Sequence, residues 1–319
     1  MRGTARPGPA PHAAVAKSSI VLGTSRLGRS GTAGPAGRGD DGEPDAASVD
    51  LAVAMLTAGY PLIDTANGYA GGRSERALGL AVRELGGLPE GVSVVSKVGA
   101  DPDTGRLDGE RVRRAFGESL ERLGVERLPL YHLHDPHHLG PVVAAAPGGA
   151  VDALVGLRDE GLVDAIGVAT GPLDELGDFF GLGVFDAMLT HNRFTLADRS
   201  AEPLIRSAGE QGATVFNAAP FGGGLLADAS PARRSYAYRP ARPEVLGRAE
   251  ELRRLCAEAG VPLGALALHA ATAHPSIDHV VVGVSSLQRL EELDALVAVE
   301  LSPTLLAAVE ALGPPPLAA

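Results

Sequence analysis

Four polar residues in the first half of the chain have the types and spacing that proton chemistry needs. Asp64 ends a short apolar run at 61–65, and Tyr69 follows it in a glycine-containing loop. Lys97 and His134 end two later apolar runs. A phenol, with a pKa near ~10, is a poor acid or base at neutral pH, but a neighbouring ammonium lowers that pKa. We therefore predict that Lys97 lowers the pKa of Tyr69 and that Asp64 pairs with Lys97.

His134 completes the set as a neutral hydrogen-bond donor that orients the reacting oxygen. Together the four side chains could deliver a proton to a carbonyl oxygen or remove one from a hydroxyl group. The set contains no nucleophile, so a cofactor must supply the other half of the reaction. Hydride exchange with a nicotinamide is the natural complement. The sequence thus predicts Asp64, Tyr69, Lys97 and His134 as the catalytic residues of an oxidoreductase.

Apolar periodicity predicts strands that alternate with helices along almost the whole chain. The predicted strands are 19–28, 61–65, 92–99, 128–134, 165–169, 185–190, 214–219 and 279–284. The predicted helices are 45–59, 74–85, 109–123, 151–160, 173–180, 201–211, 243–259, 262–273, 287–299 and 303–312. This alternation is typical of a (β/α)8 TIM barrel in a single domain. We expect residues 17–319 to form the barrel and residues 1–16 to form a flexible tail.

The predicted barrel explains why the four residues belong together. Catalytic groups of such barrels lie at the C-terminal ends of the strands, which share one rim. Asp64, Lys97 and His134 end the second, third and fourth predicted strands, and Tyr69 follows the second. Any one of them alone would more often have a structural role, as a turn cap, a loop anchor or a strand-end histidine. Their convergence from three consecutive strands favours the catalytic interpretation.

Composition limits the classes of partner. The chain of 319 residues has 39 acidic and 28 basic residues, and a net charge of −11. No cluster of Lys and Arg is long enough to follow a phosphate backbone, which argues against nucleic acid. No apolar run approaches a signal peptide or the ~20 residues of a membrane span. Cys256 is the one cysteine, which excludes an internal disulfide. We expect a cytoplasmic monomer that binds small molecules and no membrane.

Three motifs in the predicted catalytic region resemble those of the aldo-keto reductase superfamily. They are Asp64-Thr-Ala-x-x-Tyr69 with Ser74-Glu75 behind it, Ser96-Lys97-Val-Gly, and Leu130-Tyr-His-Leu-His-Asp-Pro136. The likeness extends from about residue 20 to about residue 299. It implies that Tyr69 is the family's proton donor, that Lys97 and Asp64 tune its pKa, and that His134 orients the substrate. It also implies that NADP or NAD lies extended across the barrel mouth.

Other stretches are similar to the aldose 1-dehydrogenase branch of that superfamily, which includes the D-threo-aldose (L-fucose) and L-galactose enzymes. These stretches are His134-Asp-Pro, Ala165-Ile-Gly-Val, 216–227 and Tyr236-x-Tyr238. Enzymes of the branch oxidise the anomeric carbon of a sugar hemiacetal to a lactone, a reaction in which Tyr69 would act as base. The alternative is an NADPH-dependent reductase of aldehydes or ketones, pyridoxal included.

The resemblance also implies where the cofactor is held. The loop after the seventh strand should wrap the pyrophosphate, because backbone N–H groups before a helix form a phosphate cradle. Residues 283–292 should surround the adenosine, where Ser285, Ser286 and Arg289 could meet the 2′-phosphate of NADP. The choice between NADP and NAD stays open. The predicted cofactor contacts are Thr170, His191, Pro220, Gly222, Gly224, Leu225, Gly283, Ser285, Ser286, Arg289 and Glu292.

Two other functional classes compete with this interpretation. His132 and His134 would point to one side of a strand, and such pairs at a barrel rim bind the metal of hydrolases, with His191 as a possible third ligand. That site would also need a carboxylate at the end of the eighth strand, where 279–286 has none. We therefore expect no metal. The third class is a nucleotide-sensing subunit that keeps the barrel and the cofactor but has little turnover.

Two more predictions concern loops. Substrate identity should depend on 138–149, 196–200 and 228–242, the last of which offers a polar or aromatic wall. The residues of that wall are Arg233, Arg234, Tyr236 and Tyr238. Residues 37–42 match the G-x-G-x-x-G pattern, but they do not directly follow a strand, and two adjacent carboxylates would repel a pyrophosphate. We interpret this match as a surface loop.

Overall fold

The computed structural model describes residues 14–29, 42–227 and 234–316. Several sequence predictions lie outside the described residues. They concern residues 1–13 of the tail, residues 37–41 of the G-x-G-x-x-G match, and residues 228–233, which include Arg233.

Eight parallel strands form a closed barrel in the order β1-β10-β7-β6-β5-β4-β3-β2. The strands are β1 (Ile20–Gly23), β2 (Leu62–Asp64), β3 (Ser93–Val98), β4 (Leu128–His134), β5 (Val163–Ala169), β6 (Ala187–His191), β7 (Thr214–Ala218) and β10 (His279–Gly283). The predicted (β/α)8 barrel is confirmed. The first strand is shorter than predicted, because the chain after Gly23 turns instead of remaining extended.

The helices follow the strands with bounds close to the predicted ones. They are α1 (Ala46–Thr57), α2 (Arg73–Glu84), α3 (Gly109–Leu123), α4 (Pro141–Ala145), α5 (Ala150–Asp159), α6 (Leu173–Phe180), α7 (Glu202–Glu210), α8 (Pro243–Ala259), α9 (Leu263–Thr272), α10 (Leu287–Val297) and α11 (Pro303–Ala311). The sequence did not predict α4 or a small antiparallel hairpin. That hairpin consists of β8 (Ser235–Tyr236) and β9 (Arg239–Pro240).

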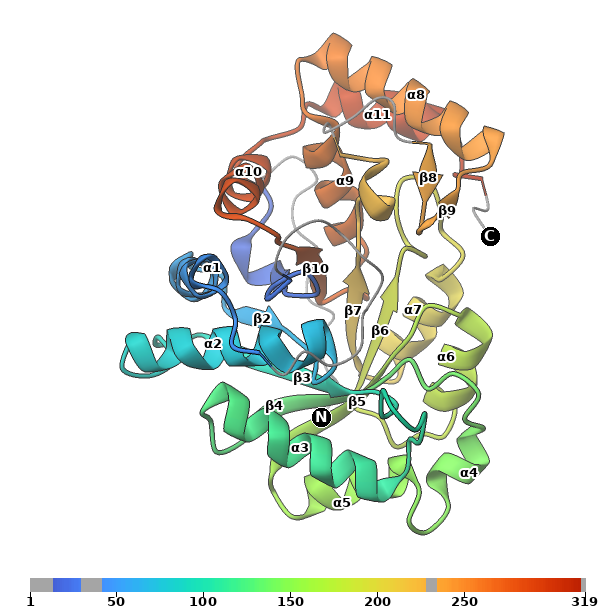
Figure 1. Cartoon of the computed structure of the whole chain (residues 1–319). Coiled ribbons are helices and arrows are strands. Elements are labelled where there is room, and N and C mark those ends of the chain that lie inside the picture. Colours follow the sequence, from blue (N-terminus) through green and yellow to red (C-terminus); the bar gives the residue numbers. More distant parts are fainter. Residues whose placement is uncertain (1–13, 30–41, 228–233, 317–319) are drawn as a thin grey trace. The chain divides into compact units, whose positions relative to one another are not determined.

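The chain divides into two compact units, which we describe separately. One comprises residues 20–189 and 282–290, and contains β1 to β5. In this unit, α2, α3 and α5 cover the outer side of the strands (Figure 1). The other comprises residues 1–19, 190–281 and 291–319. In this unit an apolar cluster joins α8, α9 and α11 to Leu225 and Tyr236.

The helix ends show why the sequence begins and ends its helices where it does. Asp45 precedes α1 and accepts a hydrogen bond from the backbone N–H of Ser48 at 2.8 Å. Asp108 does the same for α3 by accepting from the N–H of Arg111 at 3.0 Å. These side chains satisfy backbone donors that have no partner within the helix. Gly124 ends α3 in the left-handed conformation, with φ of 68°.

A close approach between α2 and α3 depends on one glycine. A Cβ atom added to Gly79 of α2 would lie 1.9 Å from the carbonyl oxygen of Arg122 in α3. The clash would be with backbone, so a side-chain rotation could not relieve it. Glycine at this position therefore sets the distance between the two helices that flank the loop containing Tyr69.

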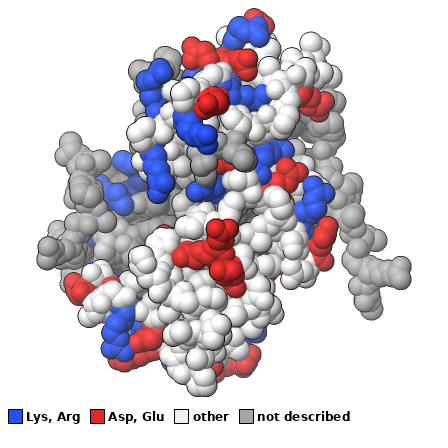
Figure 2. Space-filling model, turned by 90° about the vertical axis from the view of Figure 1, so that its right-hand side faces the viewer, with Lys and Arg blue, Asp and Glu red and all other residues white. Residues whose placement is uncertain are grey.

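Charged side chains of both signs occupy the surface. Figure 2 shows Lys and Arg residues mixed with Asp and Glu residues on the face it draws. Among the described residues, no single helix is both long and apolar enough to cross a membrane. Only α8 and α9 taken together pass that test, and they are bent by 108° at their junction.

We predict opposite effects on stability for two helical glycines. Gly79→Ala should lower the free energy of unfolding by about 1–3 kcal/mol, because α2 and α3 must move apart. Gly117→Ala is the matched control on α3, since an added Cβ there meets nothing within 4 Å. It should raise the free energy of unfolding by about 0.5–1 kcal/mol by removing backbone entropy from the unfolded chain. Denaturant unfolding of both variants, followed by circular dichroism, tests the pair, and equal effects would contradict the packing argument.

Candidate active site

The four predicted catalytic residues lie in one compact unit, at the C-terminal ends of neighbouring strands. Asp64 is the last residue of β2, and His134 is the last residue of β4. Lys97 is the penultimate residue of β3. Parallel register aligns these ends, because Asp64 pairs with Val95 across β2 and β3, and Lys97 pairs with His132 across β3 and β4. The barrel therefore brings them to one rim, as the sequence predicted.

The Lys97 ammonium is the centre of this group. Its residue is only 1% exposed, so the charge must find its partners within the protein. Nζ donates hydrogen bonds to the Asp64 Oδ1 atom at 2.5 Å and to the Thr65 carbonyl oxygen at 2.8 Å. A third, longer hydrogen bond runs to the Tyr69 hydroxyl at 3.4 Å. The predicted Asp64–Lys97 pair is thus present, and the phenol contacts it directly.

Burial and the charge of the partner have opposite effects on the pKa values of Asp64 and Lys97. Burial alone would lower the pKa of Lys97, but the nearby Asp64 and Tyr69 raise that pKa overall. Burial raises the pKa of Asp64, and the adjacent ammonium opposes that rise. At 2.5 Å, with both side chains almost wholly buried, the ionised pair is the state that leaves neither charge without a partner.

The pKa of Tyr69 is raised, which corrects the sequence prediction of a lowered value. Burial is the largest cause. Lys97 lowers this pKa, as predicted, but Asp64 and Asp135 raise it again. The prediction was wrong in its net direction, because it ignored desolvation of the phenolate and the carboxylate that offsets the ammonium. The phenol is therefore a protonated donor at neutral pH.

His134 lies beside the phenol. Its ring centroid is 5.6 Å from that of Tyr69, with the two planes at 82°. Its Nε2 atom lies 3.5 Å from the Asp135 Oδ2 atom, and its side chain is 23% exposed. A partly exposed imidazole next to a phenol can reach the oxygen of a bound molecule, which fits the orienting role implied for it.

The short segment that contains Tyr69 has an unusual backbone. A 3-10 turn spans Tyr69–Gly72, and Ala70, Gly71 and Gly72 have φ angles of 51°, 65° and 87°. A left-handed alanine is uncommon and costs energy, so the surrounding contacts must hold it in place. One such contact is the Asn67 N–H, which donates to the Lys97 carbonyl oxygen at 3.0 Å. The loop is thereby fastened to the end of β3.

His132 lies in the packed interior of the barrel. It is fully buried, and an added Cβ on Gly167 would lie 2.3 Å from its Nδ1 atom. Burial lowers the pKa of His132 to about 3, and the positive charge of Lys97 adds to the effect. A neutral imidazole packed against a glycine is thus part of the barrel interior. In the part of the chain that the structure describes, no three His, Cys, Asp or Glu side chains are grouped to hold a metal ion.

The predicted cofactor contacts of this same unit lie after β5 and at the start of α10. Thr170 is fully buried, and its hydroxyl donates to the Glu175 Oε1 atom at 2.6 Å. Ser286 accepts a hydrogen bond from the Arg289 N–H at 3.2 Å, so it caps α10. Gly283, Ser285 and Ser286 are exposed, as is Arg289. The start of α10 is therefore open to a ligand.

In the other unit, the loop after β7 contains three consecutive left-handed glycines. Gly222, Gly223 and Gly224 are all left-handed, with φ of 57°, 71° and 99°. An added Cβ on Gly222 would lie 2.4 Å from the ring of Tyr236. Successive left-handed residues turn backbone N–H groups toward one side, where they can bind a phosphate. The Gly222 and Gly224 N–H groups, however, donate within the loop, to the carbonyl oxygens of Ala219 at 3.0 Å and Phe221 at 2.9 Å, so the pyrophosphate contact implied for 220–225 stays a prediction.

Tyr236 does not belong to a substrate wall, and the sequence prediction for it is wrong. It is 4% exposed, and its hydroxyl donates to the Asn192 carbonyl oxygen at 2.7 Å and lies 2.9 Å from the Thr195 hydroxyl oxygen. Packing against the glycine loop buries the ring. Tyr238, two residues later, is 82% exposed. The hairpin separates the two phenols, which the spacing in the sequence did not reveal.

Sequence reasoning also missed Asn192. It follows β6 with φ of 61° and is 1% exposed. Its Nδ2 atom lies 3.1 Å from the Nδ1 atom of His191, but its Oδ1 atom has no hydrogen-bond partner among the described residues. A buried amide oxygen without a partner is suited to accept from a ligand N–H group, such as a carboxamide. Its burial and its left-handed backbone are visible only in the folded chain, so the sequence carried no signal that identified it. Glu292, another predicted cofactor contact, lies in the part of α10 that belongs to this unit.

A family model described as the aldo/keto reductase family matches residues 19–314. The chain belongs to the aldo/keto reductase family. As an aldo/keto reductase it is an oxidoreductase that acts on CH–OH and carbonyl groups, and it uses NADP or NAD. The metal-dependent hydrolase is thereby set aside.

Relatives of this aldo/keto reductase include sugar dehydrogenases. It is 29% identical over 239 residues to the L-galactose dehydrogenase of Arabidopsis thaliana, covering 73% of this chain and 72% of the relative. It is 32% identical to a Pseudomonas D-threo-aldose 1-dehydrogenase, over 60% of this chain and 58% of the relative. It is also 27% identical to the pyridoxal 4-dehydrogenase of Microbacterium luteolum, over 86% and 88% of the two chains.

A solved structure supports the same fold. The holo form of an aldo-keto reductase from Bacillus halodurans matches with a TM-score of 0.71. The match has 20% identity and covers 96% of this chain and 97% of that chain. At this identity the likeness concerns the barrel alone.

We predict that His132 makes the stability of this aldo/keto reductase depend on pH. Its pKa is about 3 when folded, against an ordinary value of 6.5, so the unfolded chain binds the extra proton between these values. The stabilisation is complete above pH 6.5 and is lost as pH falls toward the folded value. Denaturant unfolding should show that the native protein loses about 2 kcal/mol more than His132→Asn between about pH 7.5 and pH 5. Parallel pH profiles would contradict a buried neutral imidazole.

Proposed function

We propose that this chain is an NAD(P)-dependent aldose 1-dehydrogenase, which oxidises the anomeric carbon of a sugar hemiacetal to a lactone. The observation that supports it most is the contact of the Tyr69 hydroxyl with the buried Lys97 ammonium, which is itself paired with Asp64. The likeness to L-galactose dehydrogenase and to D-threo-aldose 1-dehydrogenase supports the sugar as substrate.

Each residue has one task in the proposed reaction. A nicotinamide held in the site would supply the acceptor for the hydride that leaves C1. Tyr69, as phenolate, takes the proton of the C1 hydroxyl, so that the oxygen keeps the electron pair that forms the lactone C=O bond. Lys97 stabilises the phenolate, and Asp64 holds Lys97 in place. His134 donates a hydrogen bond to the same substrate oxygen and orients it.

Three segments are proposed to hold the cofactor. Pro220, Gly222, Gly224 and Leu225 would surround the pyrophosphate, where the absence of glycine side chains lets the backbone approach it closely. Thr170, His191 and the buried Asn192 oxygen would meet the carboxamide. The segment with Gly283, Ser285, Ser286, Arg289 and Glu292 would surround the adenosine, where the exposed Arg289 could meet the 2′-phosphate of NADP. The chain would act as a cytoplasmic monomer on small aldoses or aldehydes, without nucleic acid or membrane partners.

One observation favours a second candidate, the reduction of an aldehyde, a ketone or pyridoxal by NADPH. The raised pKa of Tyr69 keeps the phenol protonated at neutral pH, and a protonated phenol is the donor that reduction requires. Oxidation requires the phenolate instead. In either direction the same four residues act, so the two candidates differ in substrate and direction but not in site.

We predict that Tyr69→Phe lowers the rate of hydride transfer by about 10²–10⁴-fold, because the variant cannot exchange the proton. Nicotinamide absorbance in the presence of substrate gives the rate. Tyr131→Phe is the matched control, since this buried tyrosine packs against Phe116 with ring centroids 5.3 Å apart. It should keep the native rate. Equilibrium dialysis should show that both variants bind the cofactor, and an active Tyr69→Phe would refute the proton-transfer role.

A substrate panel decides between the two candidates. We expect oxidation of L-fucose, L-galactose or D-arabinose to exceed reduction of pyridoxal or an aromatic aldehyde in kcat/KM, measured with both cofactors. Oxidation should become faster as pH rises above neutrality, because the raised pKa of Tyr69 makes the phenolate scarce at lower pH. Efficient pyridoxal reduction without turnover of any sugar would contradict the aldose assignment and favour the second candidate.

A further inference from the structure

A buried carboxylate lies directly behind the proposed catalytic residues. Glu75, in the first turn of α2, is 0% exposed. Its Oε1 atom accepts a hydrogen bond from the Ser96 hydroxyl at 2.6 Å, and Ser96 immediately precedes Lys97 in β3. Its Oε2 atom lies 3.3 Å from the Nη1 atom of Arg122 in α3. Glu75 thus connects the strand that positions the ammonium to a guanidinium on a neighbouring helix.

The Arg122 guanidinium contacts the loop that contains Tyr69 near both of its ends. Nη1 donates to the Asn67 carbonyl oxygen at 3.2 Å, two residues before Tyr69. An added Cβ on Gly72, three residues after Tyr69, would lie 2.6 Å from the Cζ atom of the guanidinium. The loop backbone therefore rests on Arg122 on either side of the phenol, and a side chain at Gly72 would prevent this contact.

Asn67 is fixed from several directions. Its N–H donates to the Lys97 carbonyl oxygen at 3.0 Å. Its Nδ2 atom donates to the Ala115 carbonyl oxygen at 3.2 Å and to Glu118 at 3.1 Å. Its Oδ1 atom accepts from the Arg111 Nη2 atom at 2.7 Å. The start of the loop is thus held by α3 as firmly as by β3.

Such a network is expensive to bury, which argues that it has a purpose beyond stability. Burial raises the pKa of Glu75, while the Ser96 hydroxyl and the Arg122 charge oppose that rise. Apolar residues of similar volume are often as stabilising as a buried ion pair. The loop it holds has three consecutive left-handed residues, of which Ala70 is not a glycine. Contacts from outside the loop must therefore determine where the phenol lies.

We propose that Glu75 and Arg122 are positioning residues for the reaction, which hold the Tyr69 hydroxyl within hydrogen-bond distance of the Lys97 ammonium. Arg122 supports the loop carbonyl of Asn67, and Glu75 aligns Arg122 with Ser96 beside Lys97. Neither residue touches the substrate in this scheme. The inference rests on the proposed role of Tyr69 in proton transfer.

Arg122→Met tests the proposal, with Glu75→Gln as the second variant. Each should lower kcat for sugar oxidation by about 10–100-fold, because a shift of the phenol by roughly 1 Å is that costly. The KM for the cofactor should stay within about twofold of the native value. Lys97 acts to lower the pKa of Tyr69, and a displaced phenol loses part of this influence. The pH at which the oxidation rate increases should therefore shift upward by roughly one unit.

Arg122→Lys provides the rescue. A lysine keeps a positive charge beside Glu75. Its ammonium lacks the planar guanidinium group, which contacts the Asn67 carbonyl and the Glu75 carboxylate at the same time. Its kcat and its pH profile should lie between those of the native protein and Arg122→Met. If Arg122 had only a structural role, the pH profiles of the native protein, Arg122→Lys and Arg122→Met would not fall in this order.

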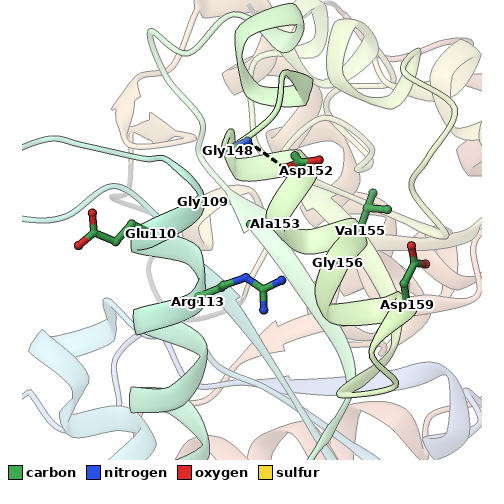
Figure 3. A pocket seen from close by; sticks show the side chains of 9 residues that line it. All are labelled: Gly109, Glu110, Arg113, Gly148, Asp152, Ala153, Val155, Gly156 and Asp159. Carbon is green, nitrogen blue, oxygen red and sulfur yellow. Dashed lines mark hydrogen bonds between the residues drawn. The ribbon is translucent and has the colours of Figure 1, made fainter.

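Arg113→Met is the matched control on the same helix. Arg113 forms two hydrogen bonds to Glu160, the residue that follows α5, at 3.1 and 2.6 Å. Figure 3 shows Arg113 beside a surface hollow between α3 and α5, together with Asp152 and Asp159. Arg248→Met controls for the loss of a buried arginine, since Arg248 binds the carbonyl oxygens of Leu312 and Gly313. Both controls should keep the native pH profile and the native kcat of the folded fraction.

Two results would overturn the proposal. One is a native kcat and pH profile in Glu75→Gln and Arg122→Met. The other is an equal fall in kcat in the controls Arg113→Met and Arg248→Met, when they lose as much thermal stability as the Glu75 and Arg122 variants. If Arg122→Met does not fold, Glu75→Gln and Arg122→Lys decide by the same readouts. An active Tyr69→Phe would instead refute the proposed function, whereas an inactive Tyr69→Phe with native Arg122 variants would refute this inference alone.

Discussion

The site depends on one buried ammonium. Lys97 lies within the barrel rim, where water cannot solvate its charge, so every acceptor must come from the protein. Asp64, the Thr65 carbonyl and the Tyr69 hydroxyl supply them. These groups belong to the end of β2 and the loop after it. A single charge thus fixes the spatial relation between two strands and the loop that contains the phenol.

The same burial determines the electrostatics of the reaction. Excluding water raises the pKa of Tyr69 more than the ammonium lowers it, because Asp64 offsets much of the positive charge. With Lys97 and Asp64 ionised and the phenol protonated, these three side chains carry no net charge. The His134 side chain is 23% exposed, so a molecule that binds at this rim can reach it.

The barrel alone does not position the phenol. Strand register brings Asp64 and Lys97 together, but Tyr69 lies in a loop whose backbone is left-handed over three residues. Its support comes from α3, which approaches closely only because Gly79 of α2 has no side chain. The packing of α2 against α3 is therefore required for the arrangement of the side chains at the rim. The same strands without this helix contact would not reproduce the site.

Local patterns in the chain were enough to predict the alternation of strands and helices, the position of three polar residues at strand ends and that of a fourth in the loop after β2, because these follow from short-range periodicity. The net pKa shift of Tyr69, the burial of Tyr236 and the contacts of Arg122 became visible only in the folded chain. Each of these depends on groups far apart in the chain that folding brings together, and no local pattern records desolvation or contact between distant segments.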